Sequence, residues 1–252
     1  MSEAVVLTIE GDVATILINK PEKRNALTVA GLLLFSEHLK AAEAADVRAL
    51  IVTGAGDRAF SAGVDLSDVG QTENWGENPL MVLCNELEAF PRPTIAVLNG
   101  AVMGGAVELS LSCDFRIAAE GTKLMAPPAR IGIHYEPAGI ARAAACLGWQ
   151  LTKRIFLLAE PFTADQLAET DYLDRIAPRD ELSTVVDKMV DDIRLAAPLA
   201  INGMKQTIVE MSRGRLDMAV ARERVTASWA SEDMKEGLAA VQQKRRPNFT
   251  GK

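Results

Sequence analysis

Cysteine, histidine and aromatic residues are scarce in this chain of 252 residues, which has 3 Cys, 2 His and 5% aromatic side chains. The cysteines, Cys84, Cys113 and Cys146, are widely spaced and form neither a Cys-x-x-Cys nor a Cys/His pattern. Such spacing argues against a disulfide framework and against a zinc site. We therefore expect buried, reduced thiols, no bound metal and a cytoplasmic location.

Long apolar runs and an excess of positive charge are also missing. No run reaches the roughly 18 apolar residues that a membrane span needs, and residues 1–3 are acidic where a signal peptide would be basic. The formal net charge is −7, which disfavours nucleic-acid binding because phosphates are neutralised by basic surfaces. We expect neither a membrane nor a nucleic-acid partner. The 48% hydrophobic content predicts a globular protein with a large core.

Short apolar strands alternate with helices over the first two thirds of the chain. The pattern predicts a β-hairpin over 5–19 and strands over 49–53, 94–98 and 115–118. Helical spacing predicts helices over 26–45 (with Thr28 as a cap), 79–90, 140–147, 152–159, 164–169 and 181–197. Residues 67–79 are rich in Ser, Asp, Gly and Asn, which is typical of a mobile surface loop.

The last part of the chain forms almost only helix. Residues 199–244 have helical character with a break at Gly214, and the basic residues 245–249 suggest a tail. The fold class is therefore α/β with a helical C-terminal part. We expect an α/β core over residues 1–197 and an all-helical region over 198–252.

The most informative stretch is residues 99–108, Asn-Gly-Ala-Val-Met-Gly-Gly-Ala-Val-Glu. It follows the strand over 94–98 and leads into a helix, so Gly104 and Gly105 lie at a tight turn where the backbone can approach a ligand. The free N–H groups of the helix start favour negative charge. Because Glu108 would repel a phosphate but can move a proton, we expect the turn to bind a developing oxyanion.

Other catalytic patterns are weak or missing. Residues 54–59, Gly-Ala-Gly-Asp-Arg-Ala, match a loose dinucleotide fingerprint, but the chain continues as a loop where that fingerprint needs a helix. No nucleophile elbow, His-Glu-x-x-His or P-loop pattern occurs. Of the remaining candidates, His134 is typical of a structural hydrogen-bonding residue, and Tyr135 of a residue lining a binding pocket.

Four segments resemble, in their order and spacing, those of one known family. They are residues 23–27 (Lys-Arg-Asn-Ala-Leu), 59–66 (Ala-Phe-Ser-Ala-Gly-Val-Asp-Leu), the glycine turn with Cys113-Asp114 after it, and 244–249 (Lys-Arg-Arg-Pro-Asn-Phe). On these segments the chain resembles the crotonase superfamily, the enoyl-CoA hydratase and isomerase family, over nearly its full length. The resemblance implies a crotonase-like spiral of ββα turns with C-terminal helices that form homotrimers, often paired into hexamers.

The same resemblance implies acyl-CoA thioester substrates and no cofactor beyond the coenzyme A of the substrate. The backbone N–H groups of Val64 and Gly105 would polarise the thioester carbonyl and stabilise an enolate, as two converging donors can. Contacts with the adenine and pantetheine parts of coenzyme A would fall on Arg24, Ala26, Ala62, Asp65 and Leu66.

The carboxylates decide which reaction we expect. Hydratases of this family use two glutamates; the first matches Glu108, but the second would fall at Pro128, which has no titratable group. Several family isomerases carry their acid at the position of Glu136. The sequence thus favours double-bond isomerisation of an enoyl-CoA, with Glu136 as the proton shuttle and Glu108 as a second acid/base or orienting group.

Three alternatives stay open at this point. Hydration of a 2-enoyl-CoA remains available if Glu108 and Glu136 hold the water together. A non-catalytic acyl-CoA-binding protein on the same scaffold is the second, with Pro128 marking a loss of activity. Other reactions that use an oxyanion hole, such as decarboxylation or thioester hydrolysis, are the third. The sequence does not specify the acyl chain length.

Overall fold

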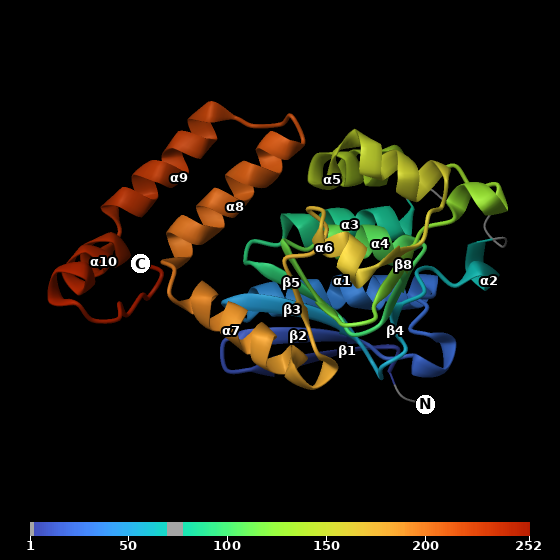
Figure 1. Cartoon of the computed structure of the whole chain (residues 1–252). Coiled ribbons are helices and arrows are strands. Elements are labelled where there is room, and N and C mark those ends of the chain that lie inside the picture. Colours follow the sequence, from blue (N-terminus) through green and yellow to red (C-terminus); the bar gives the residue numbers. More distant parts are fainter. Residues whose placement is uncertain (1–2, 70–77) are drawn as a thin grey trace.

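The computed structural model describes residues 3–69 and 78–252 and contains two β-sheets (Figure 1). The larger sheet has the order β1-β2-β3-β5-β7-β10, and only its β1–β2 pair is antiparallel. Its strands are β1 (Val5–Glu10), β2 (Val13–Ile18), β3 (Ala49–Gly54), β5 (Thr94–Leu98), β7 (Phe115–Ala119) and β10 (Arg175–Ala177). The smaller sheet has the order β4-β6-β8-β9, with β4 (Ala59–Ser61), β6 (Ala101–Met103), β8 (Lys123–Met125) and β9 (Phe162–Thr163).

The chain winds through the two sheets in repeated ββα turns. In each turn one strand joins the larger sheet, the next joins the smaller sheet, and a helix follows. The turns are β3-β4 followed by α2 (Leu66–Val69) and α3 (Pro79–Ala89), β5-β6 with α4 (Gly105–Leu111), and β7-β8 with η2 (Pro128–Ile131) and α5 (Pro137–Leu157). This arrangement confirms the expected spiral of ββα turns.

Apolar side chains cover both faces of the larger sheet, as a mostly parallel sheet requires. The larger core lies between the sheet and α1 (Val29–Ala44), α3, α4 and α5, and includes Phe35, Leu83 and Leu98. The smaller core lies on the other face, where α7 (Leu182–Arg194) packs. Thr28 caps α1 by accepting from the Gly31 N–H, which confirms the predicted cap.

Two buried asparagines fix the loops that follow β2 and β5. The Asn25 amide donates to the carbonyls of Ala55 and Ala59, and its side-chain oxygen accepts from the Lys20 N–H. The Asn99 amide donates to the carbonyls of Gly54 and Gly56. Because these bonds satisfy buried backbone groups, they hold the two turns of the spiral against each other.

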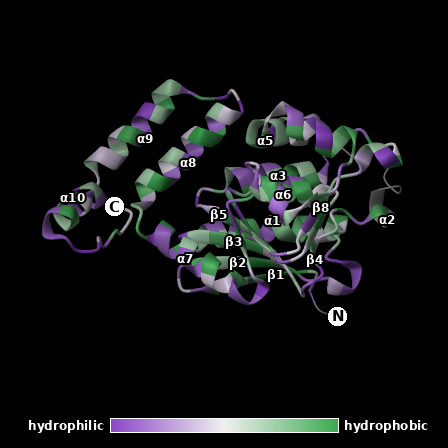
Figure 2. Cartoon of the chain, viewed as in Figure 1, coloured by the Kyte–Doolittle hydropathy of each residue, from purple (hydrophilic) through white to green (hydrophobic). Residues whose placement is uncertain are grey.

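Three helices follow the core: α8 (Pro198–Ser212), α9 (Met218–Ala230) and α10 (Glu232–Gln243). They extend away from the sheets and confirm a helical C-terminal region (Figure 1). Apolar residues lie on these helices (green in Figure 2), and several of their side chains are exposed. These exposed residues include Met204, Ile208, Met211, Met218, Trp229 and Val241.

The C-terminal residues are not a free tail, contrary to the sequence expectation. Arg245 pairs with Glu236, and the Thr250 and Gly251 N–H groups donate to the two carboxylate oxygens of Asp233 at 2.7 and 2.8 Å. The chain therefore folds back along α10, because the carboxylates at the start of that helix accept the N–H groups of the last residues.

Other predictions differ from the structure in detail. The two helices predicted over 140–147 and 152–159 lie on either side of a break at Gly148, whose φ and ψ are non-helical, and together they form α5, which begins earlier, at Pro137, and ends at Leu157. The predicted loop over 67–79 begins inside α2, and residues 70–77 lie outside the described residues. Cys84 and Cys113 are buried free thiols, whereas Cys146 is only half-buried. Across residues 3–69 and 78–252, no helix is long and apolar enough to cross a membrane.

Candidate functional site

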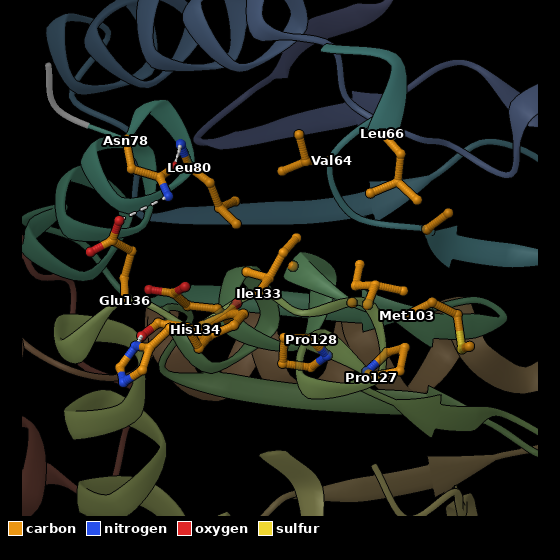
Figure 3. A pocket seen from close by; sticks show the side chains of 16 residues that line it. Val64, Leu66, Asn78, Leu80, Met103, Pro127, Pro128, Ile133, His134 and Glu136 are labelled. Carbon is orange, nitrogen blue, oxygen red and sulfur yellow. Dashed lines mark hydrogen bonds between the residues drawn. The ribbon is translucent and has the colours of Figure 1, made fainter. Parts of the chain in front are cut away.

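A pocket of about 450 Å³ opens where the smaller sheet meets the starts of α3, α4 and α5 (Figure 3). It is lined by Ala62, Val64, Leu66, Asn78, Leu80, Met103, Gly104, Gly105, Glu108, Pro127, Pro128, Ile131, Ile133, His134, Tyr135 and Glu136. The pocket thus brings together both predicted carboxylates and both predicted oxyanion residues, which come from segments far apart in the sequence. In Figure 3 the labelled polar residues Asn78, Glu136 and His134 lie opposite Leu66, Met103 and Pro127.

The backbones of Val64 and Gly105 lie next to each other in this pocket. A β-carbon built on Gly105 would lie 3.7 Å from the Val64 nitrogen, so the two residues are close neighbours. The Leu27 N–H donates to the Gly63 carbonyl, and the Leu27 carbonyl accepts from the Asp65 N–H. In such a parallel bridge the N–H of the residue in between, Val64, points away from Leu27.

Both N–H groups are available to a ligand. Gly105 is the first residue of α4, where a helix offers no internal acceptor. Within the described part of the chain, neither N–H has a hydrogen-bond acceptor. An oxygen atom placed between them would therefore receive two hydrogen bonds and the positive end of the α4 dipole.

Glu108 lies in the first turn of α4 and is almost fully buried. Its Oε1 accepts from Arg142 Nη1 at 2.5 Å, and a β-carbon on Gly139 would lie 2.6 Å from its Oε2. Arg142, on α5, is itself enclosed and also donates to Asn85 and Glu88 of α3. One oxygen of Glu108 is therefore committed to an ion pair, while the other stays in the pocket wall.

Burial raises the pKa of Glu108 above its ordinary value, and the positive charge of Arg142 partly opposes that rise. The nearby Tyr135 hydroxyl also lowers the pKa of this carboxyl. Burial and the Glu108 charge raise the pKa of Tyr135 well above its usual value, so the phenol stays protonated. Among the described residues, this buried hydroxyl has no partner at hydrogen-bonding geometry. Glu108 is thus a buried carboxyl with a raised pKa, next to a phenol that stays protonated.

Glu136 enters the same pocket from the N-cap position of α5. Its Oε1 accepts from the Asn78 amide at 3.3 Å, the dashed line in Figure 3, and its side chain is half-buried. His134 places its Nδ1 2.8 Å from the Tyr135 carbonyl, which agrees with the structural role expected of it. Among the residues that the structure describes, Glu136 is therefore held only by a neutral amide, in contrast to Glu108.

The remaining wall of the pocket is apolar. Pro128 lines it at the position where the sequence analysis expected a second glutamate in a hydratase, and Pro127, Ile131 and Ile133 lie beside it. Such a wall suits a hydrocarbon chain and offers no proton donor.

The five residues expected to contact coenzyme A lie on two adjacent segments. The Ala62 N–H donates to the Arg24 carbonyl, and Lys23 pairs with Asp65 at 2.9 Å. Of the five, Ala62 and Leu66 line the main pocket, and Ala26 lines a second, separate pocket. Two of the five residues expected to contact coenzyme A therefore line the main pocket, and the contacts themselves stay a prediction.

Sequence reasoning missed Arg142. The sequence gives little indication of its role, because an arginine within a predicted helix is expected to face solvent. Its role becomes clear only when the buried carboxylate that it contacts, Glu108, is known. Over the described ranges, no three His, Cys, Asp or Glu side chains are grouped as they would be around a metal ion.

Comparison with known proteins agrees with this geometry. The family described as "Enoyl-CoA hydratase/isomerase" matches residues 8–252. A crotonyl-CoA hydratase of Syntrophomonas wolfei is 30% identical, with 99% of each chain covered. A methylmalonyl-CoA decarboxylase of Escherichia coli is also 30% identical, over 98% of this chain and 97% of the relative. Relatives of equal identity thus have names that describe different reactions.

A solved structure is similar to this chain in its fold. It belongs to a putative enoyl-CoA hydratase/isomerase family protein from Hyphomonas neptunium, has a TM-score of 0.91 and 28% identity, and covers 99% of this chain and 98% of its own. The family match spans the two oxyanion residues, both carboxylates and the C-terminal helices. This chain therefore belongs to the enoyl-CoA hydratase/isomerase family of acyl-CoA-processing enzymes.

Proposed function

We propose that this enzyme moves the double bond of an enoyl-CoA from the 3 to the 2 position. The observation that carries the proposal is the meeting of two free N–H groups with two carboxylates in one largely apolar pocket, where a proline replaces the hydratase's second glutamate. An isomerase needs a base that serves C2 and C4, and needs no activated water.

The mechanism starts with the thioester oxygen between the Val64 and Gly105 N–H groups. Their hydrogen bonds stabilise the enolate that forms as a C2 proton leaves, and each such donor is typically worth about 10²–10³ in rate. Glu136 takes the C2 proton, and the electron pair of the C2–H bond moves into the enolate. As the enolate collapses, the C2–C3 double bond forms, and the electron pair of the former C3–C4 double bond takes the proton back from Glu136 at C4. Glu136 suits this role because, within residues 3–69 and 78–252, only the neutral Asn78 amide holds it.

Glu108 acts as a second acid/base or orienting group in this proposal. Its Oε1 is fixed by Arg142, and its other oxygen lies in the pocket wall. Coenzyme A would lie along Arg24, Ala26, Ala62, Asp65 and Leu66. No further cofactor enters the mechanism.

Hydration of a 2-enoyl-CoA is a second candidate. The specific observation in its favour is the unpartnered Tyr135 hydroxyl next to Glu108. A water held by these two groups and Glu136 could add to C3, with its proton passing to a carboxylate and a carboxyl proton going to C2.

The two candidates are separated by the absorbance of the conjugated enoyl thioester. With 3-enoyl-CoA the signal should rise, and with 2-enoyl-CoA in water it should stay constant; a fall with 2-enoyl-CoA would establish hydration instead. Neither signal moving, despite measurable binding of an acyl-CoA, would favour the non-catalytic alternative. Glu136→Gln should abolish isomerisation, whereas full activity of this variant would refute Glu136 as the shuttle.

We also propose a division of labour within the chain. Residues 1–197 bind and process the acyl-CoA, because every residue lining the main pocket belongs to that part. Residues 198–252 form a homotrimer, or a homohexamer built from trimers, through the exposed apolar side chains of α8–α10. With its free thiols, we propose that the enzyme works in the cytoplasm.

A further inference from the structure

A chain of ion pairs runs from the end of helix α8 to Glu108. Arg213, the residue that follows α8, donates to both carboxylate oxygens of Glu88 on α3, at 2.9 Å from Nε and 2.5 Å from Nη2. The same Glu88 accepts from Arg142 Nε at 3.2 Å, and Arg142 Nη1 donates to Glu108 at 2.5 Å. The four charged groups alternate in sign along the chain.

These groups are shielded from water. The exposed fraction of the side chain is 0% for Arg142, 2% for Glu108, 10% for Arg213 and 14% for Glu88. Buried charges are poorly screened, so a change at one end of the chain is felt at the other. Because Arg142 faces two carboxylates at once, its hold on one depends on what else neutralises the other.

We propose that Arg213 is a positioning residue for Glu108: by neutralising Glu88, it leaves Arg142 to hold Glu108 as a carboxylate at the pocket wall. The inference rests on the proposed function in so far as Glu108 takes part in proton transfer. It links the C-terminal helical region to the site, since Arg213 also donates to the Ala138 carbonyl in the first turn of α5.

The sign of the effect follows from the charges that face Glu108. These are Cys84 and Glu88 on α3, Tyr135 before α5, Arg142 on α5 and Arg213 after α8. Burial raises the pKa of Glu108, while Arg142, Tyr135 and Arg213 lower it. Removing Arg213 deletes one of these positive charges and also turns Glu88 into a competitor for Arg142. Both changes raise the pKa of Glu108.

The test follows the titration of Glu108 by carbon-13 NMR of glutamate-labelled protein, assigned with a Glu108→Gln variant, together with kcat/KM against pH for an enoyl-CoA. Arg213→Gln should move the titration to higher pH. It should also lower kcat/KM at low pH by roughly 2- to 30-fold, with recovery as the pH rises. Arg213→Lys keeps the positive charge, so Glu108 in this variant should titrate as it does in the parent.

A second variant predicts the opposite sign. Glu88→Gln removes the competitor for Arg142, so the titration of Glu108 should move to lower pH. This variant keeps the inference testable if Arg213→Gln fails to fold. An unchanged titration in Glu88→Gln, or in a folded Arg213→Gln, would overturn the proposal, as would an Arg213→Lys shift as large as that of Arg213→Gln.

Arg224→Gln is the matched control. Arg224 lies on α9 and donates to both oxygens of Glu210 on α8, at 2.5 and 2.8 Å, so its loss disturbs the same helices without touching the chain that leads to Glu108. In Arg224→Gln, the titration of Glu108 and the pH profile of kcat/KM should equal those of the parent. If the NMR titration moves in Arg213→Gln but the rate profile does not, the electrostatic link stands and the catalytic role of Glu108 fails.

Discussion

A β-carbon on Gly63 would lie 2.6 Å from the amide nitrogen of Gly105, closer than any non-bonded carbon can approach. Gly63 also has a φ of +83°, which side chains rarely adopt. The residue just before Val64 must therefore be a glycine for the two N–H groups to come together. This contact joins the second and third of the segments that carry the family resemblance.

Gly63→Ala should separate the two N–H groups and lower kcat/KM for every acyl-CoA substrate by about 10²–10³. The assay is the change in enoyl thioester absorbance. Gly121→Ala is the control, because Gly121 has a similar φ of +77° but open space around it. The control should lose some thermal stability and keep its activity; equal losses of activity in both variants would contradict an oxyanion hole at Gly63.

Asn25→Ala should destabilise the protein by about 3 kcal/mol, because three hydrogen bonds of a fully buried side chain are lost at about 1 kcal/mol each. Urea unfolding measures the change. Asn19→Ala is the control, since the Asn19 side chain makes one exposed bond to Glu3 and should cost little. A loss below about 1 kcal/mol for Asn25→Ala would show that these bonds do not fix the loops.

Acid should weaken the attachment of the C-terminal residues to α10. Arg245, and then the Asn248 N–H, lower the pKa of Glu236 from its usual 4.5 to about 2. The ionised Glu236 side chain thus stabilises the folded protein at pH values above 4.5, the pKa it has in the unfolded chain. This stabilisation is lost as the pH falls through the folded-state pKa of about 2. Urea unfolding at several pH values should show a smaller loss on acidification for Glu236→Gln than for the parent.

Glu223→Gln serves as the control for that experiment, because Glu223 makes no ion pair among the residues that the structure describes. Its pH dependence should match that of the parent. The same slope in Glu236→Gln and the parent would contradict the tethering of the last residues by Glu236.

The exposed apolar side chains of the C-terminal helices should mediate self-association. Trp229, on α9, is 71% exposed, and Trp149, on α5, has the same exposure outside that region. If the proposed trimer forms through these helices, Trp229→Glu should shift the enzyme towards monomers in sedimentation velocity, whereas Trp149→Glu should leave the proposed trimer intact. Dissociation by Trp149→Glu alone would place the trimer interface elsewhere.

Strands could be predicted from the sequence where they contain enough apolar residues in a row to form a recognisable pattern. Five of the six strands of the larger sheet could be predicted, because runs such as residues 94–98 are apolar and end at punctuating residues. The sixth, β10, has only three residues and was not predicted. The strands of the smaller sheet, for example β6 and β8, span three residues each, too few for a periodic pattern. Their place is fixed by pairing with distant segments, which no local signal encodes.

The candidate site shows the same division. That Gly105 and Glu108 lie together could be predicted because glycine turns and helix starts have a local signature, whereas Val64 was expected from the family resemblance; all three line the pocket, and their roles stay predictions. Arg142 could not, because its role depends on facing Glu108 across two packed helices. The folded-back C-terminal residues likewise depend on carboxylates that only the tertiary structure brings near.

The central claim is that the N–H groups of Val64 and Gly105 stabilise an enolate formed next to a carboxylate. Exchange of the C2 protons of a saturated acyl-CoA in deuterium oxide, followed by proton NMR, tests this claim without choosing between isomerisation and hydration. We predict that the enzyme catalyses this exchange and that Gly63→Ala abolishes it. Binding of the acyl-CoA with no exchange above the uncatalysed rate would contradict the account.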